Sequence, residues 1–440
     1  MKKSTLYALI FTVFLAMAAS DLPAQSPFSG EPVSISKSSA PAPDKETKKP
    51  GLWSRFVNTL KKGYSNVSKG LNKILVDNKT PDFVSKAVQI PGHEGYEFVC
   101  QGITYLPEKI VSPPSGQIKF GGYKYALLSY YPETKHTGQP SQLVIIELAS
   151  GKALRRFNLF QAESRPYTGH AGGITVAGQY VWVASGFKLY GFKLSQILDF
   201  LRDKSLQISS HPNDIPASFR IPAIDLVAEK IFEVDSKASF VSFDGNYLWV
   251  GDFVKESSKS FAPVAHHAKN PFKRNTWVAG YKVSESGAPT ATQKYTFTDG
   301  SSSRTAHKPD RLIFCRESVQ GMAVCGNYVA LSISYGAANS KLALYDSPFK
   351  TPASKVSFKP AGQSKTFSAD AWELSDNKNW RKTVELAAGS EDLEYDGRYI
   401  YVAFEGASQN YRHKWTGTNP GVKISESFYL LTPTAILNSK

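Results

Sequence analysis

The chain has 440 residues, a formal net charge of +15 and many aromatic side chains, namely 22 Tyr, 26 Phe and 7 Trp. Aromatic residues favour strands over helices, and a positive surface either favours polyanionic partners or serves solubility alone. Three cysteines without a C-x-x-C spacing exclude a disulfide scaffold and a cysteine zinc site. Cys315 and Cys325 are close enough in sequence to pair, the alternative being three buried thiols.

The first residues predict a secretory signal peptide. Lys2 and Lys3 form a basic start, residues 6–19 are an apolar run, and Ala16 and Ala18 give the small-x-small pattern of a cleavage site. We assign residues 1–25 to the signal and expect a secreted or periplasmic protein. No later stretch approaches the ~20 apolar residues of a membrane span, so we expect no transmembrane helix.

Two segments separate the signal from the remaining chain. Residues 26–50 are rich in Ser, Pro and Lys and predict a disordered linker. Residues 51–76 carry large apolar residues at steps of three and four with basic residues between them, which predicts a basic amphipathic helix. Such a helix either contacts an anionic membrane surface peripherally or packs its apolar stripe on its own protein.

A repeat begins at residue 86 and predicts a β-propeller. Four segments align without gaps, each with a strand, a two-residue turn and a second strand that begins with Tyr, a strong hairpin signal. They are Gly173–Ser185, Phe240–Asp252, Gly321–Ile333 and Asp392–Phe404. A fifth hairpin, residues 101–105 and 125–129, has a longer loop. Further β-rich runs flank every hairpin, so the unit is a four-stranded antiparallel sheet, as in a propeller blade.

The two ends of the repeat predict how the ring closes. The last unit lacks an outer strand, and the strand at residues 86–90 lacks a blade. Placing residues 86–90 on the outside of the last blade completes five blades and covers an open edge. Residues 86–440 then form one all-β domain, a five-bladed β-propeller that we expect to be a monomer. Six blades are the alternative, if residues 356–380 contain another hairpin. A short helix starting near Leu194 is expected between blades 2 and 3.

The residues that begin the innermost strands are candidates for a ligand site, because ligands of propellers bind at a mouth of the central channel. Equivalent positions face the same channel. The candidate ligand-binding residues are Gln101, Ser239, Gln320, Asp392, Glu405 and Trp415, and the candidate acid and base are Glu391 and His170. Adjacent carboxylates at Glu391 and Asp392 are also candidate ligands of Ca²⁺, which takes six to eight oxygens. The alternative is a set of polar groups that only bond one another.

Two basic loops are further candidates. His266 and His267 lie near Lys269, Lys273 and Arg274, which predicts a basic surface patch. Residues 411–415 combine Tyr, Arg, His, Lys and Trp in what is predicted to be a loop, a composition that suits stacking on sugars and holding anions.

Two strands resemble a known family. Phe98–Tyr105 resembles the first-blade strand of propeller-type glutaminyl cyclases, and Ser390–Tyr401 resembles one of their later blades. At the end of the following strand, where that family has a Glu, this chain has Ser129-Tyr130-Tyr131. A looser likeness to calcium-dependent gluconolactonase-like propellers rests on architecture alone. Both likenesses imply an exported bacterial β-propeller.

Two classes of function follow from these patterns. The first is a binding protein that holds a glycan, peptide or anionic polymer at the channel mouth. The second is a hydrolase or cyclase that acts through Glu391 and His170, with or without Ca²⁺. The chain lacks Gly-x-Ser-x-Gly, His-Glu-x-x-His and a phosphate-binding glycine loop, so nothing supports serine nucleophilic catalysis.

Overall fold

The structure of the protein is a computed structural model that describes residues 80–113, 123–133, 138–202, 223–255, 257–267, 270–274, 276–359 and 364–440. The predicted signal peptide, linker and helix at residues 51–76 lie outside these ranges. Within them, no helix has both the length and the apolar composition that crossing a membrane requires.

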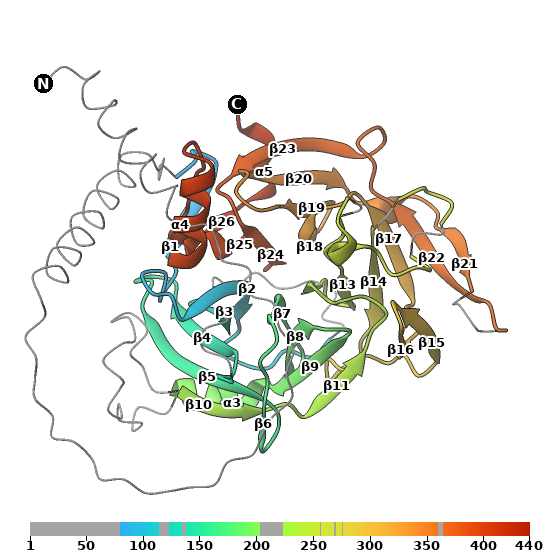
Figure 1. Ribbon diagram of the computed structural model, residues 1–440, viewed down its shortest axis with the longest axis horizontal. Coiled ribbons are helices and arrows are strands. Elements are labelled where there is room, and N and C mark those ends of the chain that lie inside the picture. Colours follow the sequence, from blue (N-terminus) through green and yellow to red (C-terminus); the bar gives the residue numbers. More distant parts are fainter. Residues whose placement is uncertain are drawn as a thin grey trace, which may run out of the picture. The chain divides into compact units, whose positions relative to one another are not determined.

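Five four-stranded antiparallel blades surround a central axis (Figure 1), which confirms the predicted five-bladed propeller. From the axis outward, blade 1 consists of β2 (Phe98–Leu106), β3 (Tyr125–Pro132), β4 (Gln142–Glu147) and β5 (Ala153–Ala162). Blade 2 consists of β7 (Gly173–Ala177), β8 (Tyr180–Ser185), β9 (Lys188–Lys193) and β11 (Lys230–Glu233). Blade 3 consists of β12 (Phe240–Phe243), β13 (Tyr247–Gly251), β14 (Thr276–Lys282) and β17 (Arg311–Cys315).

The remaining two blades lie at the end of the chain. Blade 4 consists of β18 (Val319–Cys325), β19 (Tyr328–Ile333), β20 (Ser340–Asp346) and β23 (Trp380–Leu386). Blade 5 consists of β24 (Ser390–Tyr395), β25 (Ile400–Phe404), β26 (Ser427–Leu431) and, from the other end of the domain, β1 (Val84–Gln89).

Several strands extend the blades outward. β10 (Ala223–Val227) pairs in parallel with β5, which also pairs with the short β6 (Arg165–Pro166). The hairpin of β21 (Ser354–Phe358) and β22 (Phe367–Glu373) joins the outer edge of β17. The six-blade alternative is therefore wrong, because this hairpin lengthens blade 3. β15 (Lys294–Asp299) and β16 (Ser302–His307) form a separate hairpin.

Aspartates fix two of the repeated turns. Asp244 Oδ1 accepts hydrogen bonds from the backbone amides of Asn246 and Tyr247, both at 2.8 Å. Asp396 occupies the equivalent place in blade 5 and accepts from the amides of Arg398 and Tyr399. Such turns of Asp and Gly set the register of the two strands that follow, which is why these hairpins can be read directly from the sequence.

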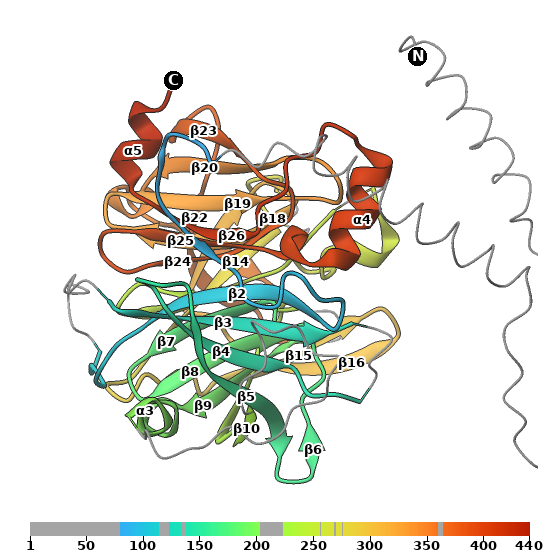
Figure 2. The same ribbon diagram turned by 90° about the vertical axis from the view of Figure 1, so that its left-hand side faces the viewer.

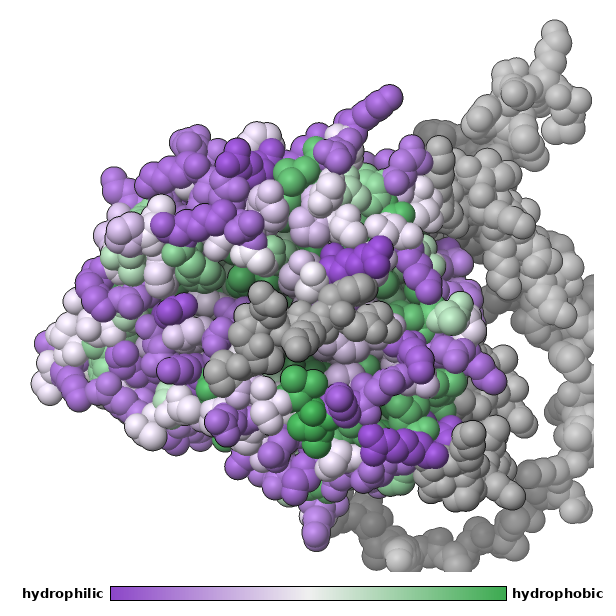
Figure 3. Space-filling model, turned by 180° about the vertical axis from the view of Figure 1, so that it is seen from behind, coloured by the Kyte–Doolittle hydropathy of each residue, from purple (hydrophilic) through white to green (hydrophobic). Residues whose placement is uncertain are grey.

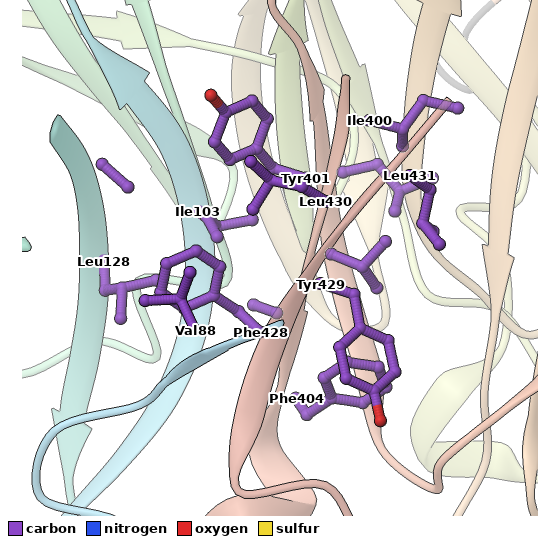
Figure 4. Close-up of a cluster of buried hydrophobic side chains, with 14 of the residues drawn as sticks. Val88, Ile103, Leu128, Ile400, Tyr401, Phe404, Phe428, Tyr429, Leu430 and Leu431 are labelled. Carbon is purple, nitrogen blue, oxygen red and sulfur yellow. The ribbon is translucent and has the colours of Figure 1, made fainter. Parts of the chain in front are cut away.

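The ring closes through β1, as predicted. β1 pairs antiparallel with β26, Val88 opposite Phe428, and the amide of Ile90 donates to the carbonyl of Glu426 at 2.8 Å. Val88 is 4% exposed and joins a cluster of buried side chains from blades 1, 4 and 5, part of which Figure 4 shows. The two ends of the domain are thus held together by one sheet and one apolar cluster.

The inner strands pack closely around the axis. β24 contacts the inner strands of all four other blades, so the inner strand of blade 5 also reaches across the axis. At Gly173 an added Cβ would lie 2.4 Å from the backbone nitrogen of Val241, and at Gly321 it would lie 2.6 Å from the backbone oxygen of Glu391. Glycine occupies these two positions in the inner strands because the neighbouring backbone leaves no room for a side chain.

Helices mark the two faces of the propeller. α4 (Gln409–Thr418) lies on one face, which we call the α4 face, whereas α3 (Leu194–Arg202) and α5 (Pro433–Asn438) lie on the other (Figure 2). α3 confirms the expected helix, but the helix lies between β9 and β11 within blade 2, so its predicted place between blades 2 and 3 was wrong. Short 3-10 turns are η3 (Lys259–Phe261), η4 (Pro348–Lys350) and η5 (Glu405–Ala407). Seen from the side opposite to that of Figure 1, hydrophilic residues cover most of the periphery of the propeller (Figure 3).

The three cysteines are buried and unpaired. Cys315 lies on β17 of blade 3 and Cys325 on β18 of blade 4, so the pairing considered from their spacing does not form.

Candidate functional site

Three inner strands begin with a β-bulge at the same repeat position. The residue pairs that flank the bulges are Cys100/Ile103 in β2, Val319/Gly321 in β18 and Ser390/Leu393 in β24. A bulge interrupts the alternation of a strand and redirects the side chains within it. These bulges contain the predicted site residues Gln101, Gln320 and Glu391. Their side chains therefore depart from the regular alternation of the strands.

Four side chains meet where blades 1, 4 and 5 begin, and we call them the mouth cluster: Gln101, Gln320, Glu391 and Glu405. Gln101 Nε2 donates to Glu405 Oε2 at 2.9 Å, and Gln320 Nε2 donates to Glu391 Oε1 at 3.3 Å. The carboxyl groups of Glu391 and Glu405 lie next to each other and interact, which contributes to the raised pKa of Glu391. Glu405 follows β25 on the α4 face, so the cluster lies at the α4 end of the channel.

Burial makes the two carboxyl groups share a proton. Burial, the neighbouring Glu405 carboxyl and Asp392 raise the pKa of Glu391 well above its usual value. Burial also raises the pKa of Glu405, although the amide of Gln101 opposes this by donating to its charged form. Two carboxylates in one desolvated place cannot both ionise at neutral pH. One proton therefore stays between them, and the cluster presents both an acid and an acceptor.

Asp392 lies deeper than the mouth cluster and joins blades. Its Oδ2 accepts from the backbone amides of Ile174 at 2.9 Å and Ile103 at 3.3 Å, which belong to blades 2 and 1. Burial raises the pKa of Asp392 well above its usual value. Asp392 therefore accepts from the amides of blades 1 and 2, whereas Glu391 accepts from Gln320. Calcium binding by Glu391 and Asp392 stays a prediction.

Glu394 is a further buried acid on β24. Its Oε2 accepts from the hydroxyls of Thr175 and, at 3.4 Å, Thr104, again on blades 2 and 1. Burial raises the pKa of Glu394 to about 8, against the opposing effect of these hydrogen bonds. Asp392 and Glu394 therefore hold the inner strands together across the axis in the protonated state.

Two predicted site residues make other contacts. Ser239 Oγ accepts from the amide of Phe253 at 2.9 Å and so anchors a loop of blade 3. His170 is exposed and stacks on the ring of Tyr131 at 4.4 Å between ring centroids, and Tyr131 in turn hydrogen-bonds Tyr411 at 2.9 Å between hydroxyl oxygens. Within the described residues no hydrogen bond joins His170 to Glu391, so the two do not form the direct acid–base pair expected from the sequence.

The segment predicted as an aromatic-basic loop is the helix α4, and this prediction was wrong. Trp415 is 4% exposed, and added Cβ atoms on Gly389 and Gly406 would lie within 2.8 Å of its ring. A side chain packed so closely beneath backbone offers no face for a ligand to stack on. Trp415 instead supports the backbone next to Glu405.

The predicted basic surface patch at His266 and His267 was also wrong. The two histidines are 6% and 1% exposed, and their Nε2 atoms lie 3.2 and 3.3 Å from Asp235 Oδ2. The neighbouring lysines suggested an exposed loop. The histidines are instead buried next to Asp235, which lies 31 residues before His266 in the sequence.

An aromatic group on the α4 face was not predicted as a site. It follows the second strands of blades 3 and 4 and consists of Phe253, Phe261 and Tyr335, of which Tyr335 is 46% and Phe261 38% exposed. Phe253 packs edge-on against Phe261 and stacks on Tyr335, and Lys255 Nζ lies 3.2 Å from the centre of the Tyr335 ring. We call this group the aromatic rim. Phe253 and Tyr335 follow the second strands of their blades, as Glu405 does in blade 5, and this shared position could have identified the aromatic rim from the sequence.

Comparison with known proteins finds no family model and no curated protein that matches this chain. Among solved structures, the glutaminyl cyclase of Myxococcus xanthus is 7% identical, covers 79% of this chain and 94% of its own, and has a TM-score of 0.31. Hsv2 of Kluyveromyces lactis is 8% identical over 70% of each chain, with a TM-score of 0.26. A bacterial enzyme of the class that two strands resemble is thus among the similar structures, and such low similarity says nothing of what this chain binds.

Proposed function

We propose that the protein binds a ligand at the α4 end of its central channel, through the mouth cluster and the aromatic rim. The observation that supports this most is the carboxyl pair Glu391–Glu405, flanked by the amides of Gln101 and Gln320. Gln101 and Glu391 are buried, Gln320 and Glu405 are partly exposed, and three of the four enter from redirected bulges. A scaffold has no need of so many polar groups at one end of its axis.

The chemistry of the site favours a glycan or peptide over an anionic polymer. Carboxyl and amide groups bond hydroxyl, amide and amino groups of a ligand, and exposed aromatic rings stack on the apolar faces of sugars and side chains. A phosphate or carboxylate placed at the mouth would meet two carboxyl groups and be repelled. The positive charge of the chain would then serve an anionic partner only away from the channel.

The substitution Glu405→Gln tests the binding site. It keeps the size of the side chain and an oxygen for Gln101 but removes the charge that the pair presents. We expect it to weaken binding of a ligand found on glycan and peptide arrays by about tenfold or more, since a hydrogen bond to a charged group contributes roughly 1.5–3 kcal/mol. Titration calorimetry measures the affinity.

Glu285→Gln is the matched control, because Glu285 is exposed in the segment between β14 and β15. It should bind like the parent. If both variants kept the parent's affinity, the ligand would bind elsewhere and the mouth cluster would be structural.

Acid–base catalysis is the second candidate, as a hydrolase or cyclase. The shared proton favours it, because one carboxyl can donate a proton while the other accepts one. In this arrangement the partner of Glu391 is Glu405, in place of His170. Turnover of the bound ligand, lost in both Glu391→Gln and Glu405→Gln, would support an enzyme, whereas binding without turnover supports a binding protein. A thermal shift with Ca²⁺ and with EDTA tests the calcium dependence.

We further propose that the protein acts outside the cytoplasm as a monomer. The proposal rests on the signal-like residues 1–25 and on the ring closure by β1, which leaves the sheet of blade 5 complete. For the basic segment at residues 51–76, a peripheral contact to an anionic membrane surface and packing on the protein itself both remain open predictions.

A further inference from the structure

We propose that Asp235, His266 and His267 bind a divalent transition metal, for which Zn²⁺ is the best match, in a structural site on the outer side of blade 3. Asp235 follows β11, and the two histidines lie in the loop between η3 and β14. The donor atoms of all three residues lie within 4.8 Å of one another.

The distances from Asp235 Oδ2 to the two histidine nitrogens match those in a tetrahedral metal centre. The two Nε2 atoms lie 3.2 and 3.3 Å from Asp235 Oδ2. Zinc bonds of about 2.05 Å to nitrogen and oxygen place tetrahedral ligand atoms about 3.3 Å apart. The imidazole rings stand at 82° to each other, so the two neighbouring histidines approach the carboxylate from different directions. Their loop permits this, whereas in a regular strand they would point to opposite sides.

Hydrogen bonds alone leave this cluster incomplete. His267 Nε2 and Asp235 Oδ1 are buried, and neither has a hydrogen-bond partner among the described residues. The approach of His267 Nε2 to Asp235 Oδ2 is close without having the direction of a hydrogen bond. Buried polar atoms nearly always have a partner. A metal ion between the three donors would supply one to His267 Nε2, and a carboxylate that binds through both oxygens would also satisfy Asp235 Oδ1.

The surroundings of the cluster favour a closed structural site over a catalytic one. The side chains of His266, His267 and Asp235 are 5%, 1% and 0% exposed. Aromatic rings enclose the two imidazoles, namely Trp277, Tyr295, Phe297 and Phe358. The hydroxyl of Tyr295 donates to Asp235 Oδ2 and so orients the carboxylate, the usual role of a group behind a metal ligand.

The position of the site explains why a metal would be useful there. Trp277 is on β14, Tyr295 and Phe297 are on β15, and Phe358 is on β21. The hairpins β15–β16 and β21–β22 are additions outside the repeated blade, and an isolated hairpin is marginally stable in water. A metal held by the end of β11 and the loop before β14 would fasten both additions to blades 2 and 3.

Metal analysis of the intact, untagged protein tests the site. We expect about one zinc ion per chain after purification from zinc-replete medium, and a lower unfolding temperature after chelation that Zn²⁺ restores. His267→Ala and Asp235→Asn should each lower the metal content at a fixed free zinc concentration by about tenfold or more.

His307→Gln is the matched control. His307 is another buried histidine next to blade 2, where it stacks on Phe232 at 4.0 Å and its Nδ1 lies 3.0 Å from the carbonyl of Glu233. This variant should keep the metal. The proposal is overturned if the parent protein neither contains nor is stabilised by a transition metal, or if the metal persists in both ligand variants. The metal content and stability of the parent protein are measured without the variants, so this outcome does not depend on whether the variants fold.

Discussion

Removing the closing strand, residues 84–92, is expected to abolish cooperative unfolding of the propeller. β1 supplies the outer strand of blade 5, and Val88 and Ile90 are 4% and 1% exposed. Burying two such side chains contributes roughly 1.5–3 kcal/mol each, and the lost strand pairing adds about 1 kcal/mol per hydrogen bond. The sum is comparable with the whole stability of a domain, about 5–15 kcal/mol.

A point variant makes the same test with less disturbance. Val88→Asp places an unpaired charge in the apolar cluster of blades 1, 4 and 5 and should lower the free energy of unfolding by about 4 kcal/mol or more. Gln89→Asp is the matched control, because Gln89 is exposed on the other side of the strand. Urea denaturation measures both. Equal stability of the two variants would mean that β1 does not close the ring.

Raising the pH from about 6.5 to 8.5 is expected to destabilise the protein by at least about 2 kcal/mol. Burial raises the pKa of Glu394 to about 8 and that of Asp252 to about 7. In this window the folded protein holds protons that the unfolded chain, with carboxyl pKa values of about 4, has released. Unfolding therefore releases protons, and the stability present at lower pH is lost as the pH rises through the folded pKa values.

In the metal-free protein, His267 opposes this trend only at lower pH. Burial lowers its pKa to about 4, so its contribution to stability grows as the pH rises from there to about 6.5, the unfolded value, and is then complete. The range above pH 6.5 thus isolates the buried acids. Glu394→Gln should flatten the decline by about 1 kcal/mol per pH unit, whereas Glu285→Gln should leave it unchanged. A stability that rises across this range would contradict raised carboxyl pKa values.

Local signals made the blades predictable from the sequence. Asp244 and Asp396 hold their turns within five residues, and the alternating apolar strands beside them need no distant partner to be recognised. Closure by β1 was predictable because a strand without a blade and a blade without an outer strand were both visible. In the mouth cluster, Gln101, Gln320 and Glu391 were found from their place at the start of the inner strands, and Glu405 was also among the predicted site residues.

Contacts between distant segments explain the rest. His266 and His267 are buried because Asp235 and four aromatic rings from three strands enclose them, and none of these partners is apparent from the neighbouring lysines. The segment that forms α4 has no regular apolar spacing, so its helix depends on Trp415 packing under Gly389 and Gly406. The pairing of Glu391 with Glu405 was not predicted for the same reason, since Glu405 lies next to Glu391 only once blade 5 has folded.

In the proposed ligand site, a proton shared by Glu391 and Glu405 replaces the repulsion between two charged carboxylates, and infrared difference spectroscopy measures that proton. The spectrum of the parent minus that of Glu391→Gln at pH 7 should contain the carbonyl band of a protonated carboxyl group, and the band should fade as the pH rises. Glu285→Gln should give no such band. A difference spectrum at pH 7 that shows only an ionised carboxylate would contradict the shared proton and the ligand site built on it.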